Sequence, residues 1–320
     1  MVTMSQARQQ RIAALDLIKI FAICGVLLIH LVGKTDFGGI FWYAQAVPIF
    51  MVIMGYNCKG KINWRAAGKA YVGYLLLFMA SLVLALLANV PLSLRFLPLG
   101  FLPFEGPGTY WIQLYFLFIF ISPLLSRLRR RVPLHLFLLV LFMSGWAFDM
   151  MYELAVEKLN LYGGVIYLYK ICPLRYILCF GLGMIIKERS PQWYVKTIWP
   201  LACLSAIYLY VRNYTPADVP CIFFENAGWH TGENGFAAFY PAMQVASVMC
   251  LCRKMKDCKY LFLGRFTYHV FLFQILWFPV ARRFVYNEVL FAILTFACCF
   301  SGGFLFYRIS NQVNKLIFKK

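Results

Sequence analysis

The residues best suited to chemistry lie in the first apolar run of the chain, Ile12 to Val32, which contains Asp16, Lys19 and His30. Lys19 and His30 are eleven residues apart, or about three helical turns plus 20°, so a helix presents both on one face. They are then roughly 16 Å apart along the axis. Asp16 lies three residues before Lys19, at the spacing of an ion pair. An imidazole titrates near neutrality and can remove a proton from a hydroxyl, while a nearby cation attracts phosphates.

Ionisable groups inside an apolar run need a reason, because each costs at least about 2.5–3.5 kcal/mol on insertion into a membrane. One interpretation is that Asp16 and Lys19 reach the inner interface and His30 only caps the outer end. The other is that one face carries a functional path from Lys19 to His30. The shared face favours the second interpretation for His30.

Three polar side chains in later apolar runs are further candidates. Arg175 is expected in the middle of a membrane helix, where an arginine can bind an anion, a carbonyl or a buried carboxylate. The alternative is that it pairs with Asp149 or Glu153. His269 and Gln274 share one run, where His269 can serve a site or simply bond to a neighbouring helix.

An aromatic pair follows a bend rich in glycine and proline, Glu105–Trp111. The bend is expected to deliver Tyr110 and Trp111 to the outer end of the next run, where a sugar can stack on them. A plain turn followed by interfacial aromatic residues is the alternative.

The cysteines indicate neither a disulfide framework nor a metal site. Most of them lie inside apolar runs, where they act as small apolar residues. Cys250, Cys252 and Cys258 cluster, but no histidine joins them at the spacing of zinc ligands.

The composition predicts an all-α integral membrane protein. Hydrophobic residues make up 62% of the chain, charged residues only 13%, and the mean hydropathy is +0.71. Soluble domains carry roughly 25% charged residues. The apolar runs are about 16 to 22 residues long, the length of a membrane helix and not of a barrel strand. We expect residues 1–320 to form one membrane domain without a separate soluble domain.

Ten apolar runs predict a bundle of about ten transmembrane helices. They are Ile12–Val32, Phe41–Cys58, Ala70–Val90, Trp111–Ser126, Leu134–Met150, Leu168–Ile186, Val195–Val211, Phe236–Leu251, Tyr260–Ala281 and Val289–Tyr307.

The positive charge predicts the orientation of these helices. The net charge is +19, but the basic residues form short clusters between apolar runs, which disfavours nucleic acid as a partner. Alternate loops hold most of them, and short basic loops are typically cytoplasmic, so both termini are predicted in the cytoplasm of a multi-pass protein of the cell membrane. The basic set includes Arg8, Arg11, Lys59, Lys61, Arg65, Lys69, Arg127, Arg129, Arg130, Arg131, Lys187, Arg189, Lys196, Arg253, Lys254, Lys256, Lys259, Arg308, Lys315, Lys319 and Lys320.

Several segments together resemble the acyltransferase 3 family of integral membrane O-acyltransferases, and within it the branch of sugar and exopolysaccharide O-acetylases. The similar segments occur in the family's order: Arg11–His30, Val47–Tyr56, Gly106–Trp111, Leu174–Tyr176 with Gly181–Gly183, and Leu263–Tyr268.

This resemblance implies a bundle of about ten helices that moves an acyl group, usually acetyl, from cytoplasmic acyl-CoA. The acceptor is a hydroxyl of a cell-surface glycan or of its lipid-linked precursor, and no cofactor is tightly bound. The basic residue and histidine implicated in catalysis map to Lys19 and His30, although the family more often has arginine at the first position. Members often carry a late histidine where this chain has Gln274.

The expected catalytic residues are therefore His30, Lys19 and Arg175. The expected substrate-binding residues are Asp16, Tyr110, Trp111, Gln274 and His269. Two other functions stay open: a transporter or flippase for a glycan precursor, whose path would use the same buried polar groups, and a catalytically silent sensor or scaffold.

Overall fold

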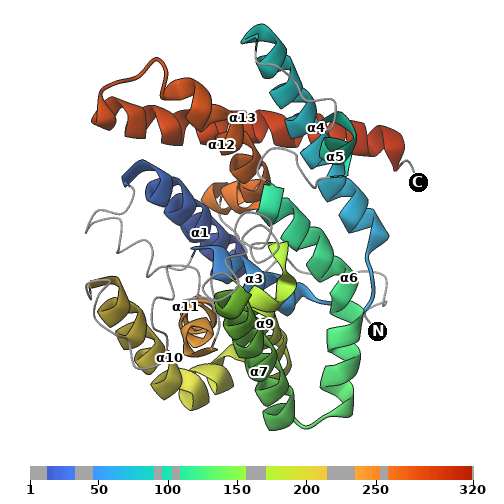
Figure 1. Ribbon diagram of the computed structural model, residues 1–320, viewed down its shortest axis with the longest axis vertical. Helices are drawn as coiled ribbons and strands as arrows, with labels where there is room; N and C mark the ends of the chain where they lie inside the picture. Colours follow the sequence, from blue (N-terminus) through green and yellow to red (C-terminus); the bar gives the residue numbers. More distant parts are fainter. Residues whose placement is uncertain are drawn as a thin grey trace.

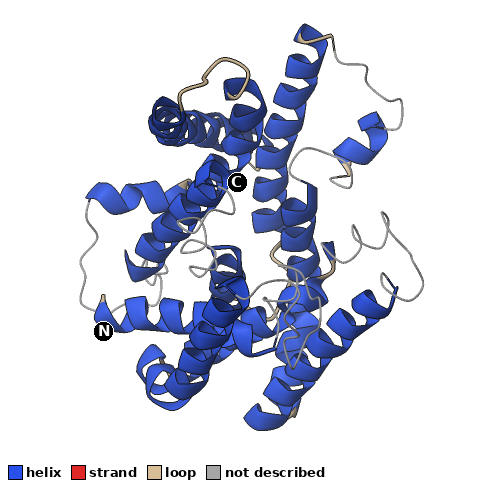
Figure 2. Cartoon of the chain, turned by 60° about the vertical axis from the view of Figure 1, so that its left-hand side comes forward, coloured by secondary structure: helices blue, strands red, loops and turns tan. Residues whose placement is uncertain are grey.

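The structure is a computed structural model that describes residues 13–32, 46–89, 96–102, 109–155, 171–214, 235–252 and 259–318. Within these residues the chain forms helices and no strand (Figures 1 and 2). The α-helices are α1 (Ala13–Val32), α3 (Ala46–Asn57), α4 (Trp64–Leu87), α5 (Phe96–Phe101), α6 (Thr109–Arg131), α7 (Leu134–Glu153), α9 (Ile177–Arg189), α10 (Pro191–Tyr214), α11 (Phe239–Leu251), α12 (Thr267–Ala281) and α13 (Glu288–Ile317). Three 3-10 helices complete the set: η2 (Pro173–Tyr176), η3 (Gly235–Ala238) and η4 (Lys259–Arg265).

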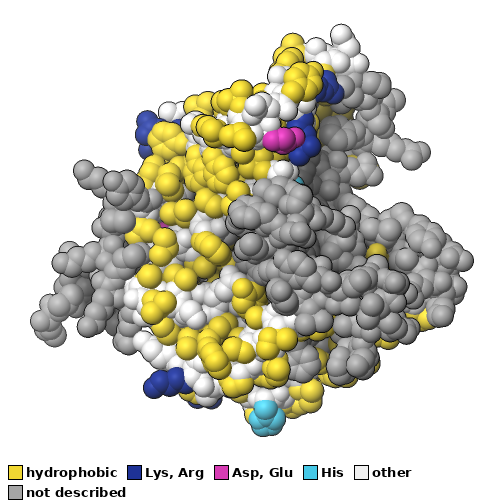
Figure 3. All heavy atoms as spheres, turned by 90° about the vertical axis from the view of Figure 1, so that its left-hand side faces the viewer, with side chains coloured by type: hydrophobic (Ala, Val, Ile, Leu, Met, Phe, Trp, Pro, Cys, Tyr) yellow, Lys and Arg dark blue, Asp and Glu magenta, His cyan; other side chains and the backbone are white. Residues whose placement is uncertain are grey.

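Five of these helices are long and apolar enough to cross a membrane: α1, α4, α6, α7 and α13. Helices α3, α11 and α12 are apolar but shorter. Figure 3 shows one face on which hydrophobic side chains form a broad band, with most charged side chains near its margins. The all-helical membrane class is therefore confirmed, while the number of ten spans and the cytoplasmic position of both termini stay predictions.

The predicted runs each overlap a helix, but two of them are interrupted. The run Leu168–Ile186 contains the 3-10 helix η2 before α9 begins at Ile177. Pro173 explains the break, because proline has no backbone N–H to continue a helix begun before it. The prediction that Arg175 lies in the middle of a helix is therefore wrong. The run Tyr260–Ala281 likewise divides at Phe266 into η4 and α12.

The closest helix pair in the described core is α3 with α9, where glycines bring the two backbones together. A Cβ atom added to Gly55 would collide with the carbonyl oxygen of Phe180, and one added to Gly183 would collide with that of Val52. Small residues are typical of helix interfaces in membranes, because there the attraction comes from close van der Waals packing. Helix α1 packs on α3 beside this pair, so its polar residues are held against a tightly packed core.

Candidate functional site

The N-terminal part of α1 carries an ion pair next to η4. The Lys19 Nζ atom lies 3.3 Å from Asp16 Oδ1. The Asp16 side chain is only 4% exposed, whereas that of Lys19 is 27% exposed. Gly264 of η4 lies directly against the Cα, Cβ and backbone oxygen of Asp16, so η4 packs closely on this part of α1. The pairing predicted from the three-residue spacing is thus present, with the ammonium group on the more open side.

The C-terminal end of α1 brings His30 against α12. The imidazole lies 5.3 Å from the ring of Phe278, and the side chain is exposed at the helix end. Arg282 Nη2 donates a hydrogen bond of 3.3 Å to the backbone carbonyl of His30. The same guanidinium lies 5.4 Å from the ring of Phe291, which in turn lies 5.9 Å from Phe278. His30 therefore has the Phe278 ring beside its imidazole and the Arg282 guanidinium at its backbone carbonyl.

One face of α12 meets α1, and Gln274 is on that face. Val270 packs with Ile23 and Leu27 of α1, and Phe278 contacts His30. Gln274 lies four residues after Val270 and four residues before Phe278, so all three share one face of α12. Its side chain is 2% exposed, and its Oε1 atom has no hydrogen-bond partner among the described residues. A buried amide oxygen without a partner can accept a hydrogen bond from a donor group of a ligand.

His269 lies on a different face of α12, toward α4 and α13. Its ring lies 5.4 Å from that of Tyr307, and a Cβ atom on Gly73 would lie 3.6 Å from its Nε2. Neither ring nitrogen has a hydrogen-bond partner within the described part of the chain. The hydrogen bond to a neighbouring helix that would explain His269 as a structural residue is thus not present there. Nor does His269 share the face that carries Gln274.

Arg175 belongs to another part of the bundle. It is 1% exposed, and its guanidinium lies 5.2 Å from the ring of Tyr176. Its 3-10 helix η2 packs against α6, α7 and α9, and the buried Asp149 is in the last turns of α7. The structure therefore brings His30 together with α12, but holds Arg175 among other helices. The side chains of Tyr110 and Trp111 lie outside the described residues.

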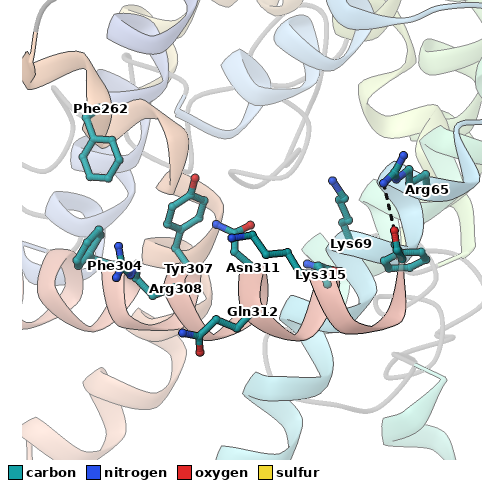
Figure 4. Close-up of a pocket in the computed structure, with 11 residues that line it drawn as sticks. Arg65, Lys69, Phe262, Phe304, Tyr307, Arg308, Asn311, Gln312 and Lys315 are labelled. Carbon is teal, nitrogen blue, oxygen red and sulfur yellow. Dashed lines mark hydrogen bonds between the residues drawn. The ribbon is translucent and has the colours of Figure 1, made fainter. Parts of the chain in front are cut away.

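A basic pocket between α4 and α13 was not predicted from the sequence. This α4–α13 pocket has a volume of about 1000 Å³. Figure 4 shows its side chains along α13, with Arg65 and Lys69 of α4 at one end and Phe262 of η4 at the other. Its lining residues are Arg65, Lys69, Phe262, Phe304, Tyr307, Arg308, Asn311, Gln312, Asn314, Lys315 and Phe318.

The sequence contains a signal for this pocket at the end of the last helix. Tyr307, Asn311, Asn314 and Phe318 follow one another at three- or four-residue intervals, the spacing of one helical face. Two asparagines on one face at the end of an apolar helix indicate a surface that faces something other than lipid. No comparable sequence signal indicated that Arg282 lies beside His30. Its hydrogen-bond partner is a backbone carbonyl more than two hundred residues away in the chain.

Comparison with protein families gives one match. The model of a family described as an acyltransferase domain matches residues 12–308, from the beginning of α1 into α13. Comparison with curated proteins gives no match, and comparison with solved structures gives none either.

Proposed function

The chain belongs to this acyltransferase family, and on that premise we propose that it is a membrane O-acyltransferase that moves an acyl group, most simply acetyl, from cytoplasmic acyl-CoA to a hydroxyl of a cell-surface glycan or its lipid-linked precursor. The cell membrane is its proposed location. The observation that carries the proposal is the polar face of α1, with a cation at one end and an imidazole at the other, in a family of acyltransferases.

We assign the role of general base to His30. One ring nitrogen accepts the proton of the acceptor hydroxyl while the hydroxyl oxygen attacks the thioester carbonyl. The tetrahedral intermediate then collapses, the carbon–sulfur bond breaks, and the proton passes to the departing CoA thiolate. The products are an O-acyl ester and free CoA, so no oxidant or further reactant is needed.

Two arginines are candidates for stabilising the negative oxygen of the intermediate. Arg175 was expected in this role because it lies inside an apolar run of the sequence. Arg282 has the stronger support, because its guanidinium bonds to the His30 carbonyl and is therefore next to the reacting group. We assign Arg175 to holding η2 between α6, α7 and α9, and Arg282 to the charge beside His30.

The substrates approach from opposite ends of α1. Lys19 and Asp16 are proposed to face the donor, and Gln274 to contact a substrate through its open amide oxygen. Tyr110 and Trp111 are proposed to hold the sugar acceptor. His269 is proposed to contact the donor side, because its neighbour Tyr307 lines the α4–α13 pocket.

The test compares His30→Ala with a matched histidine variant, His135→Ala, which changes an exposed residue at the start of α7. Purified protein in lipid receives acetyl-CoA labelled in the acetyl group together with a glycan extract. We expect His30→Ala to lose transfer by roughly 10²–10⁴-fold and His135→Ala to keep it.

Retention of full transfer by His30→Ala would refute the role of His30. Uptake of the glycan without labelling of any hydroxyl would support a transporter instead.

A further inference from the structure

We propose that the α4–α13 pocket binds the phosphorylated nucleotide end of acyl-CoA, an inference that rests on the proposed function. The pocket's volume of about 1000 Å³ is at the upper end of what small-molecule sites offer. It therefore suits a large ligand better than a single phosphate ion.

The charge of the pocket fits a ligand with several phosphates. Its described lining contains four cations, Arg65, Lys69, Arg308 and Lys315, and no acidic residue. Arg65 has a structural task, because its Nη2 donates to the carbonyl of Phe318 at 3.3 Å and ties the end of α13 to α4. Lys69 and Lys315 are exposed and have no hydrogen bond or ion pair with any described residue. Their ammonium groups are therefore available to phosphates.

The remaining lining fits a purine base. Phe304, Tyr307 and Phe318 supply ring faces on which a base can stack. Asn314 is 7% exposed; its Nδ2 donates to Ser310 Oγ at 3.2 Å, while its Oδ1 has no partner among the described residues. A buried amide oxygen can accept a hydrogen bond from the amino group of adenine. Cations, ring faces and an open acceptor together favour a nucleotide over an anionic lipid headgroup.

The pocket also lies next to the N-terminal part of α1. Phe262, one of its walls, is in η4, the same short helix whose Gly264 lies on Asp16. A nucleotide held in the pocket can therefore direct its long thioester-bearing arm past η4 toward Lys19 and α1. All four cations belong to the basic set predicted to be cytoplasmic, the side on which acyl-CoA is found. Residues 311–318 lie beyond the matched family region, so the family match does not by itself supply this site.

The test measures equilibrium binding of free CoA, dephospho-CoA and adenosine 3′,5′-bisphosphate to full-length protein in nanodiscs of neutral lipid. The pocket variant is Lys69→Gln/Lys315→Gln, and the control is Lys59→Gln/Lys61→Gln, which removes the same charge from exposed lysines outside the pocket. Each lost phosphate contact is expected to weaken CoA binding roughly tenfold. The pocket variant should therefore bind CoA roughly a hundredfold more weakly, with a smaller preference for CoA over dephospho-CoA. The control variant should bind CoA like the wild type.

Equal CoA affinity in the pocket variant and the wild type overturns the inference. It is also overturned if phosphatidylglycerol in the nanodisc, and not adenosine 3′,5′-bisphosphate, displaces CoA, because the pocket then recognises lipid headgroups. Acyl transfer is measured separately on the same preparations. Wild-type protein that binds CoA as expected but transfers no acyl group supports the pocket and refutes the proposed function. The opposite result is that the wild type transfers the acyl group, while loss of Lys69 and Lys315 leaves CoA affinity unchanged. That result supports the proposed function and refutes the pocket.

Discussion

Gly264 of η4 lies in direct contact with Asp16 of α1, so that a Cβ atom on the glycine would be 2.5 Å from the Asp16 Cβ and 2.8 Å from its backbone Cα and oxygen. Backbone atoms cannot move aside as a flexible side chain can. The substitution Gly264→Ala must therefore separate η4 from α1. We expect a stability loss of about 1–3 kcal/mol and a loss of acyl transfer, measured by thermal unfolding and a labelled-acetyl assay.

The comparison variant is Gly25→Ala, on the same helix α1. Its added methyl group would be 3.3 Å from the Ala46 side chain, a much milder contact. Equal stability of Gly264→Ala and Gly25→Ala would contradict the contact at Asp16.

The ion pair between Asp16 and Lys19 predicts different outcomes for stability and activity. Lys19→Arg keeps a positive charge at this position and should keep most activity. Lys19→Met removes the ion-pair partner of the buried Asp16 carboxylate and should lower the free energy of unfolding by about 1–2 kcal/mol. The double variant Asp16→Asn/Lys19→Met should recover stability but not transfer. Recovery of both would show that the pair is only structural.

Arg282 and Arg283 form a matched pair for testing the charge beside His30. Both are exposed, but only Arg282 bonds to the His30 carbonyl. Arg282→Ala should lower kcat by roughly 10–10²-fold and leave KM for acyl-CoA unchanged, because the proposed nucleotide site is elsewhere. Arg283→Ala should have wild-type kinetics, and a similar kcat loss in both variants would argue against a specific role for Arg282.

Gln274 can be tested by a substitution of similar shape, Gln274→Met. Removing a buried amide oxygen without a partner should raise stability by about 1 kcal/mol. If the oxygen contacts a substrate, the same variant should lose transfer activity while unfolding at a higher temperature. A variant that is more stable and fully active would remove Gln274 from the site.

The helical membrane class and the polar face of α1 could be predicted because both depend on local sequence. A long apolar run indicates a membrane helix whatever its neighbours are, and the three-residue spacing of Asp16 and Lys19 is enough to predict their pairing. The end of α12 at Ala281, before Arg282, was also visible as a change in polarity.

The neighbours of these residues could not be predicted, because they come from distant parts of the chain. Lys69 and Lys315 both belong to the predicted basic set, but their spacing in the sequence does not show that they line one pocket. Arg175 was misplaced because an apolar run hid the effect of Pro173 on the helix.

The glycine contact between α3 and α9 restricts how the protein can move during a catalytic cycle. Backbones that touch at Gly55 and Gly183 cannot rotate or slide past one another without steric overlap, so this pair acts as a stationary frame. Helices α12 and α13, joined by the turn after Ala281, lie outside this pair and carry the contact to His30 and a wall of the α4–α13 pocket.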